Sequence, residues 1–95
     1  MPSVNFSTTR GFAGETVRIT TATTTLVKTG QGAVLGFLVA STTGGTLVFH
    51  DALSAIAPLT GTITPGLGWF ALPLQFSVGL TVVSANTIDV TIVYL

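Results

Sequence analysis

The sequence predicts an all-β protein, a single small antiparallel β-sandwich of jelly-roll type with about seven to eight short strands. Two observations lead to this fold class. Apolar and polar residues alternate over residues 74–82 and 87–94, and a period of two is typical of half-buried strands. Turn-forming residues recur roughly every eight to twelve positions, a spacing typical of sandwiches and small barrels.

The chain is expected to have two parts, an extended arm over residues 1–14 and a sandwich domain over residues 15–95. The first part is polar and interrupted by glycine, so no core strand is expected there. Phe6 and Phe12 stand in it as isolated aromatic anchors. We expect this arm to lie on a neighbouring subunit, with Phe6, Arg10 and Phe12 as interface residues.

Short runs of alternating or continuous apolar residues predict the strands of the sandwich. Residues 33–40 form a nearly continuous apolar run, and glycine on both sides favours a buried central strand over a helix. Threonine and valine dominate the flanking runs, as suits a pleated and partly exposed surface. The expected strands, in chain order, are residues 16–20, 25–29, 33–40, 46–51, 61–64, 69–72, 74–82 and 87–95.

Turn residues are expected to separate these strands. Residues 42–45, Thr-Thr-Gly-Gly, predict a hairpin turn, and residues 84–86, Ser-Ala-Asn, predict the turn of a closing hairpin over residues 74–95. Residues 52–59 are expected to form a loop or at most a brief helix, because Pro58 would end a helix. Pro73 is expected to break the strand before it.

The composition predicts a protein that works through contacts with other subunits. Only 6% of the residues are charged, against about 25% in ordinary soluble domains, and the formal net charge is zero. Such a chain has no basic surface for nucleic acid and little charge to keep copies apart. We therefore expect partners to cover much of the surface. The alternative is a monomer whose threonine and glycine keep it solvated.

Several functional classes are not expected. There are no cysteines for disulfides or thiolate chemistry, and the N-terminus lacks the pattern of a secretory signal. No apolar run approaches the roughly 20 residues of a membrane-spanning helix. One histidine and three scattered carboxylates do not suggest a metal site. Gly30-Gln31-Gly32 lacks the βαβ context of a nucleotide-binding loop, so we expect hairpin geometry there and no cofactor.

Catalysis is not expected either, although His50, Asp51 and Ser54 include the residue types of a nucleophilic triad. Neighbouring residues in a strand point to opposite faces, so Asp51 is poorly placed to orient His50. No glycine-flanked elbow presents Ser54. Asp51 is expected instead to cap the turn that follows its strand.

The one tryptophan, Trp69, follows a glycine-rich segment. A single tryptophan in a sandwich of this size most often fills the core, and a subunit contact or a ligand platform are the alternatives. For a ligand platform, Asn86 and His50 are the further candidate contacts. Val83, Val93 and Leu95 are expected to form a subunit interface, because they place apolar side chains on the face where polar residues would otherwise be exposed to solvent.

Five motifs in order resemble small virion-associated β-sandwich proteins of tailed bacteriophages. They are VKTG (27–30), GFLV (36–39), GGTLVFHD (44–51), FSVGLTV (76–82) and DVTIVY (89–94). The resemblance covers roughly residues 16–95. It implies a structural, non-enzymatic virion protein, either a capsid decoration (cement) protein or an accessory subunit of head or tail fibres.

The resemblance also implies partners and a location. The partners would be the major capsid protein or other virion subunits, and copies of the chain itself in a homo-oligomer, with a trimer favoured. The protein would be found in the virion, after assembly in the host cytoplasm, with no nucleic acid or membrane bound. The alternative function is a carbohydrate- or receptor-binding β-sandwich module of a phage tail or fibre.

Overall fold

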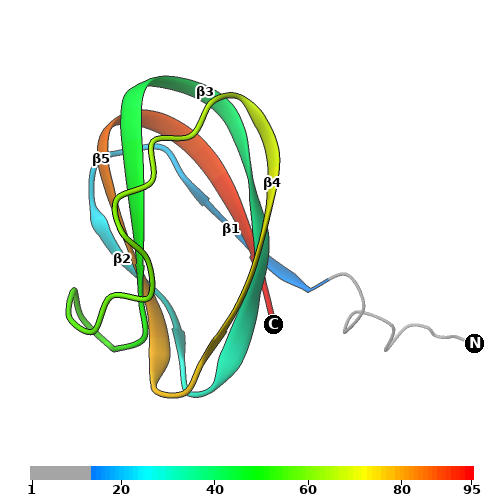
Figure 1. The fold of residues 1–95 in the computed structure, drawn as a ribbon, viewed down its shortest axis with the longest axis vertical. Coiled ribbons are helices and arrows are strands. Elements are labelled where there is room, and N and C mark those ends of the chain that lie inside the picture. The colour runs from blue at the N-terminus through cyan, green and yellow to red at the C-terminus, as the bar shows by residue number, and fades with distance from the viewer. Residues whose placement is uncertain (1–13) are drawn as a thin grey trace, which may run out of the picture.

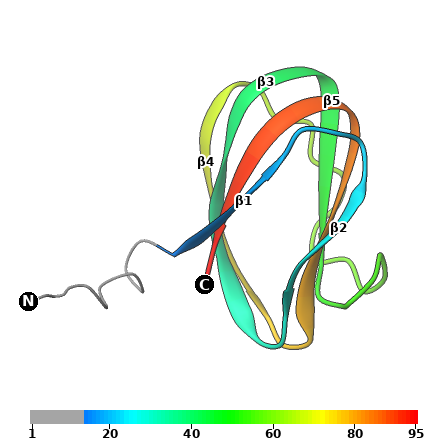
Figure 2. The same ribbon diagram turned by 180° about the vertical axis from the view of Figure 1, so that it is seen from behind.

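The computed structural model describes residues 14–95, which form five β-strands in one antiparallel sheet and no helix (Figure 1). The central strands β3 and β5 pair along most of their length. β1 and then β2 pair with the other side of β5, and β4 pairs with the other side of β3 (Figure 2). The strands are β1 (Glu15–Ile19), β2 (Thr24–Thr29), β3 (Gly32–His50), β4 (Gly68–Phe76) and β5 (Gly79–Tyr94). The all-β prediction is therefore confirmed.

The sheet folds back on itself where β3 and β5 bend together (Figure 1). Thr43 and Gly44 both lie opposite Thr87, which is the two-against-one pairing of a β-bulge. The bend uses residues that tolerate positive φ, with φ at 64° in Gly44 and 60° in Asn86. The Asn86 side-chain amide donates a hydrogen bond to the Gly44 carbonyl at 2.9 Å, which ties the two bent strands together.

Both predicted hairpin turns were wrong. Residues 84–86 lie inside β5 and residues 42–45 lie inside β3, while the chain turns at Ser77 and Val78, between β4 and β5. The cause is physical, because residues that tolerate positive φ serve hairpin turns and bulges alike. The expected strands over residues 33–40 and 46–51 are two parts of one long bent strand, β3. The expected strand over residues 74–82 is instead divided between β4 and β5 by the turn at Ser77 and Val78.

The predicted number of strands was therefore too high. The expected strands at residues 33–40 and 46–51 merge into β3, residues 69–72 and 74–76 belong to β4, and residues 79–82 and 87–94 belong to β5. The expected strand at residues 61–64 is reduced to an isolated bridge at Ile63. No helix forms over residues 52–59. Pro73 does not break β4, because the strand lies at an edge of the sheet, where a missing N–H is tolerated.

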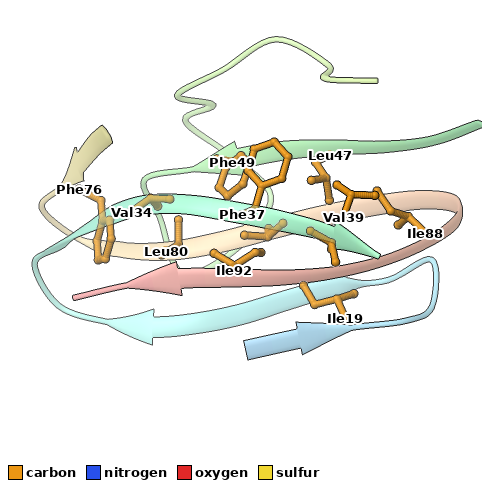
Figure 3. Packing of buried hydrophobic residues seen from close by; sticks show 12 residues of the cluster. Ile19, Val34, Phe37, Val39, Leu47, Phe49, Phe76, Leu80, Ile88 and Ile92 are labelled. Carbon is orange, nitrogen blue, oxygen red and sulfur yellow. The ribbon is translucent and has the colours of Figure 1, made fainter. Parts of the chain in front are cut away.

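The hydrophobic core lies between the two halves of the folded sheet (Figure 3). Phe37 comes from the half of β3 before the bend and Phe49 from the half after it, and their ring centroids are 5.9 Å apart. Phe37 also stacks on Phe70 of β4 at 5.4 Å. The buried residues of the core cluster are Ile19, Val34, Phe37, Val39, Leu47, Phe49, Phe76, Leu80, Val82, Ile88, Val90 and Ile92.

Candidate functional site

Asp51, at the end of β3, binds the backbone of the turn between β4 and β5. Its carboxylate accepts hydrogen bonds from the N–H groups of Ser77 at 3.0 Å, Val78 at 2.8 Å and Gly79 at 3.4 Å. The hydrogen bonds from Val78 and Ser77 hold the pKa of the Asp51 carboxyl below its ordinary value. Asp51 is thus a turn cap, as expected, but of a turn distant in sequence rather than the one that follows its strand.

The lowered pKa predicts that Asp51 stabilises the fold near neutral pH and less in acid. The contribution is complete above the unfolded value of about 3.9 and is lost as the pH falls through the folded value. We expect the thermal midpoint of Asp51→Asn to lie below that of the parent at about pH 7 and to converge with it in acid, as the pH falls below the folded pKa of Asp51. Thermal unfolding followed by circular dichroism across this range measures both.

Asp89→Asn is the matched control for this prediction, because Asp89 also has a lowered pKa. The main cause there is an exposed bidentate ion pair with Arg18, at 3.0 and 2.7 Å. We expect Asp89→Asn to lower the thermal midpoint by less than Asp51→Asn does. Because salt screens exposed ion pairs, this decrease should become smaller still in about 1 M NaCl. If the thermal midpoint of Asp51→Asn were lowered by the same amount at every pH, the stabilising role of the ionised Asp51 carboxylate would be contradicted.

His50, Asp51 and Ser54 do not form a triad. His50 is 8% exposed, and its Nδ1 lies 3.0 Å from the carbonyl oxygen of Ile56 in the loop after β3. The Asp51 carboxylate faces the turn described above, and Ser54 is exposed in the loop. His50 therefore has a structural contact that closes this loop on the sheet.

Trp69 lies on the outer surface of β4 rather than in the core, so the prediction of a core residue was wrong. The side chain is 52% exposed. Its ring lies over Gly36 of β3, where an added Cβ would be 2.6 Å from two ring carbons. The alternation along β4 indicates this outward position. Phe70, Leu72 and Leu74 pack against the core, so Trp69, one residue before Phe70, points to the opposite face.

The three residues predicted as a ligand platform lie in different parts of the fold. Trp69 pairs with Leu38 in the half of β3 before the bend. Asn86 lies at the bend itself and contacts Gly44, while His50 ends β3. The structure therefore does not bring the three together.

The residues predicted to form a subunit interface fall into two groups. Val83 and Val93 are half-buried in β5, and Leu95 is exposed after its end. The predicted arm contacts Phe6, Arg10 and Phe12 lie outside the described residues.

Sequence reasoning missed a groove at the end of the fold opposite the bend. Its polar part is a hollow of about 520 Å³, lined by Lys28 of β2, Gln31 of the following turn, and Gln75 and Ser77. The buried ring of Phe76 also lines it. The expected hairpin at Gly30-Gln31-Gly32 was wrong, because β2 and β3 do not pair with each other. The turn instead carries the chain from one side of β5 to the other and so brings Lys28 beside the start of β3.

No protein-family model, curated protein or solved structure matches this chain. The described residues contain no helix that is long and apolar enough to cross a membrane. Within residues 14–95, no three His, Asp or Glu side chains gather in a cluster that could hold a metal ion. The candidate binding features of the described residues are therefore the groove and the outer surfaces.

The outer surfaces carry many large apolar side chains. Eight of them are between 40% and 67% exposed, and the described residues include few charged groups to separate them. They are Leu26, Leu38, Leu53, Ile56, Leu67, Trp69, Val78 and Leu95. Surfaces of this kind are suited to burial against other proteins, and the groove supplies a cationic feature among them.

Proposed function

We propose that this protein is a structural subunit of a larger assembly, most specifically a capsid decoration (cement) protein of a tailed bacteriophage that stabilises the head by homo-oligomeric packing. On this proposal it is not an enzyme, and its partners are the major capsid protein or other virion subunits. Contacts with neighbours would then be many and individually weak, and symmetry would multiply them.

The observation that carries this proposal is the set of half-exposed apolar side chains on a chain of zero net charge. A monomer with this surface would have little electrostatic repulsion to prevent association. Burial against neighbours removes apolar area from water, and each Å² of apolar area buried stabilises the contact by about 25 cal/mol. The sequence motifs that resemble virion-associated proteins point the same way.

We also infer that the folded sheet acts as a jelly-roll-like sandwich. Its two halves enclose one core, and counting the two bent strands twice gives seven short strands. In this arrangement one rigid body would present two outer faces to its neighbours. Residues 1–14 would serve as an arm that reaches the shell or a sister subunit.

Co-sedimentation with capsids tests the proposal. The full chain, incubated with capsids that lack it, should pellet with them and should form an oligomer by light scattering. Deletion of residues 1–14 should weaken co-sedimentation while the remaining domain still unfolds cooperatively. A stable monomer that ignores capsids would exclude the decoration function, and undiminished binding of the truncated chain would exclude the role of the arm.

A carbohydrate- or receptor-binding module of a phage tail or fibre is the second candidate. The observation in its favour is the indole of Trp69, which is 52% exposed and lies next to Gly36. Aromatic rings of this kind can stack on the apolar face of a sugar ring. Glycan binding by the isolated protein that is lost in Trp69→Ala, with the fold retained, would favour this candidate.

A further inference from the structure

We propose that the groove at the end of the fold binds a carboxylate side chain of a partner protein other than this chain, with Lys28 as the residue that recognises it. This inference rests on the proposed function, since it names the chemistry of the partner to which the subunit attaches. The carboxylate would enter the polar hollow, and an apolar neighbour on the same segment would lie against the continuation of the groove on β3 and β4.

The polar hollow is built around Lys28, which has no ion-pair partner in the described part of the chain. Among residues 14–95, no carboxylate side chain lies within ion-pair distance of the Lys28 ammonium. Gly32 makes room for it, because a Cβ there would lie 3.0 Å from Nζ. The amides of Gln31 and Gln75 and the hydroxyl of Ser77 line the same hollow. Leu95 completes the lining, and its backbone oxygen lies beside the same position of Gly32. A lysine ammonium without a side-chain carboxylate partner, beside side chains that can donate neutral hydrogen bonds, suits a carboxylate.

A partner of different sequence is the better source of the carboxylate, because the acidic side chains of this chain are already engaged. It contains only three acidic side chains. Asp51 accepts three backbone N–H groups, and Asp89 is paired with Arg18 through both of its oxygens. Glu15 also has an interaction of its own. A second copy would have to break one of these contacts to fill the groove.

An apolar hollow continues the groove from its polar end. This second hollow, of about 530 Å³, is lined by Leu35, Pro73 and Leu74 among others, and it shares two residues with the first. The shared residues, Ala33 and Gln75, pair with each other across β3 and β4. An extended segment that carries a carboxylate and, a short way along, an apolar side chain would fit both hollows.

A peptide titration of the purified full chain tests this proposal without any capsid. The probe is the peptide acetyl-Gly-Glu-Gly-Leu-Gly-amide, and the control is the same peptide with glutamine in place of glutamate. Addition of the glutamate peptide should shift the backbone amide resonances of Gln31, Gly32, Gln75 and Ser77. Its affinity should fall as salt is raised, because the contact involves an accessible charge.

Two variants of Lys28 test whether this residue binds the glutamate of the peptide. Lys28→Gln should weaken the binding of the glutamate peptide by at least about tenfold, as the loss of a hydrogen bond between charged groups predicts. Lys28→Arg keeps the charge and should retain most of the affinity. Both should keep the dispersed spectrum of the folded protein, because Lys28 is only half-buried.

Three outcomes would overturn the proposal. The first is equal binding of the glutamine peptide, and the second is no loss of affinity in Lys28→Gln. The third is binding of sodium acetate as tightly as the peptide, because the ligand would then be a small free carboxylate and not a protein segment. A failure of co-sedimentation would count against the decoration function but would leave this titration unchanged, so the two can fail separately.

Discussion

Phe49→Ala is expected to lower the free energy of unfolding by about 3–5 kcal/mol. Phe49 is completely buried, and its ring faces that of Phe37 across the two halves of the folded sheet. The substitution removes apolar contacts and leaves a cavity where the two halves meet. The loss would take a large part of the about 5–15 kcal/mol that holds a typical domain together. Urea denaturation followed by circular dichroism measures it.

Leu67→Ala is the matched control for this substitution. Leu67 is an apolar residue of the described chain with 67% of its surface exposed, so its truncation should change stability by no more than about 0.5 kcal/mol. Equal losses in the two variants would contradict a core between the two halves. If Phe49→Ala does not fold at all, Phe49→Leu should show the same ranking with a smaller loss.

Gly36→Ala is expected to destabilise the fold by about 1–3 kcal/mol, although it adds a single methyl group. The new Cβ would lie 2.5 Å from the carbonyl oxygen of Phe70 and 2.6 Å from the ring of Trp69. The ring can move away, but the carbonyl belongs to the paired strand β4 and cannot move without disturbing the sheet. Because Trp69 is the only tryptophan, its fluorescence emission should also change.

Gly61→Ala serves as the control for a glycine in open space. No atom lies within 4 Å of the position that its Cβ would take, so we expect a change within about 0.5 kcal/mol and unchanged emission. The double variant Gly36→Ala, Trp69→Ala should recover only part of the loss, since the clash with the Phe70 carbonyl remains. Full recovery would show that the ring alone is responsible.

Alternation predicted the fold class correctly and the buried face over much of β5, but it could not locate the ends of the strands. Val78, expected on the buried face, is 54% exposed, and Thr81, expected on the outer face, is 1% exposed. Leu80, Val82, Val90 and Ile92 are buried as the pattern requires. The pattern predicts a hairpin turn at Asn86, whereas this residue lies inside β5, next to the bulge in which Thr43 and Gly44 both lie opposite Thr87. A hairpin turn and a bulge both need a residue that tolerates positive φ. Only the partner strand decides between them, and pairing between distant segments is not encoded in a local pattern.

The candidate site was predicted less well than the fold, for a related reason. The Lys28 groove depends on a turn that joins two strands across β5, and nothing near Lys28 in sequence indicates Gln75 or Ser77 as neighbours. Asp51 was recognised as a cap because carboxylates at strand ends commonly bind backbone amides. The turn that it caps could not be identified without the tertiary structure.

The pairing of β1 with β5 determines when this protein can fold. Arg18 and Asp89, which pair across these strands, are 71 residues apart in the chain. Contacts this distant must wait for most of the polypeptide, and topologies dominated by them fold in about milliseconds to seconds. During synthesis β1 and β2 leave the ribosome without the strand that they need. The native sheet can therefore close only after β5 has emerged, so β1 and β2 remain without their partner strand while β3, β4 and β5 are synthesised.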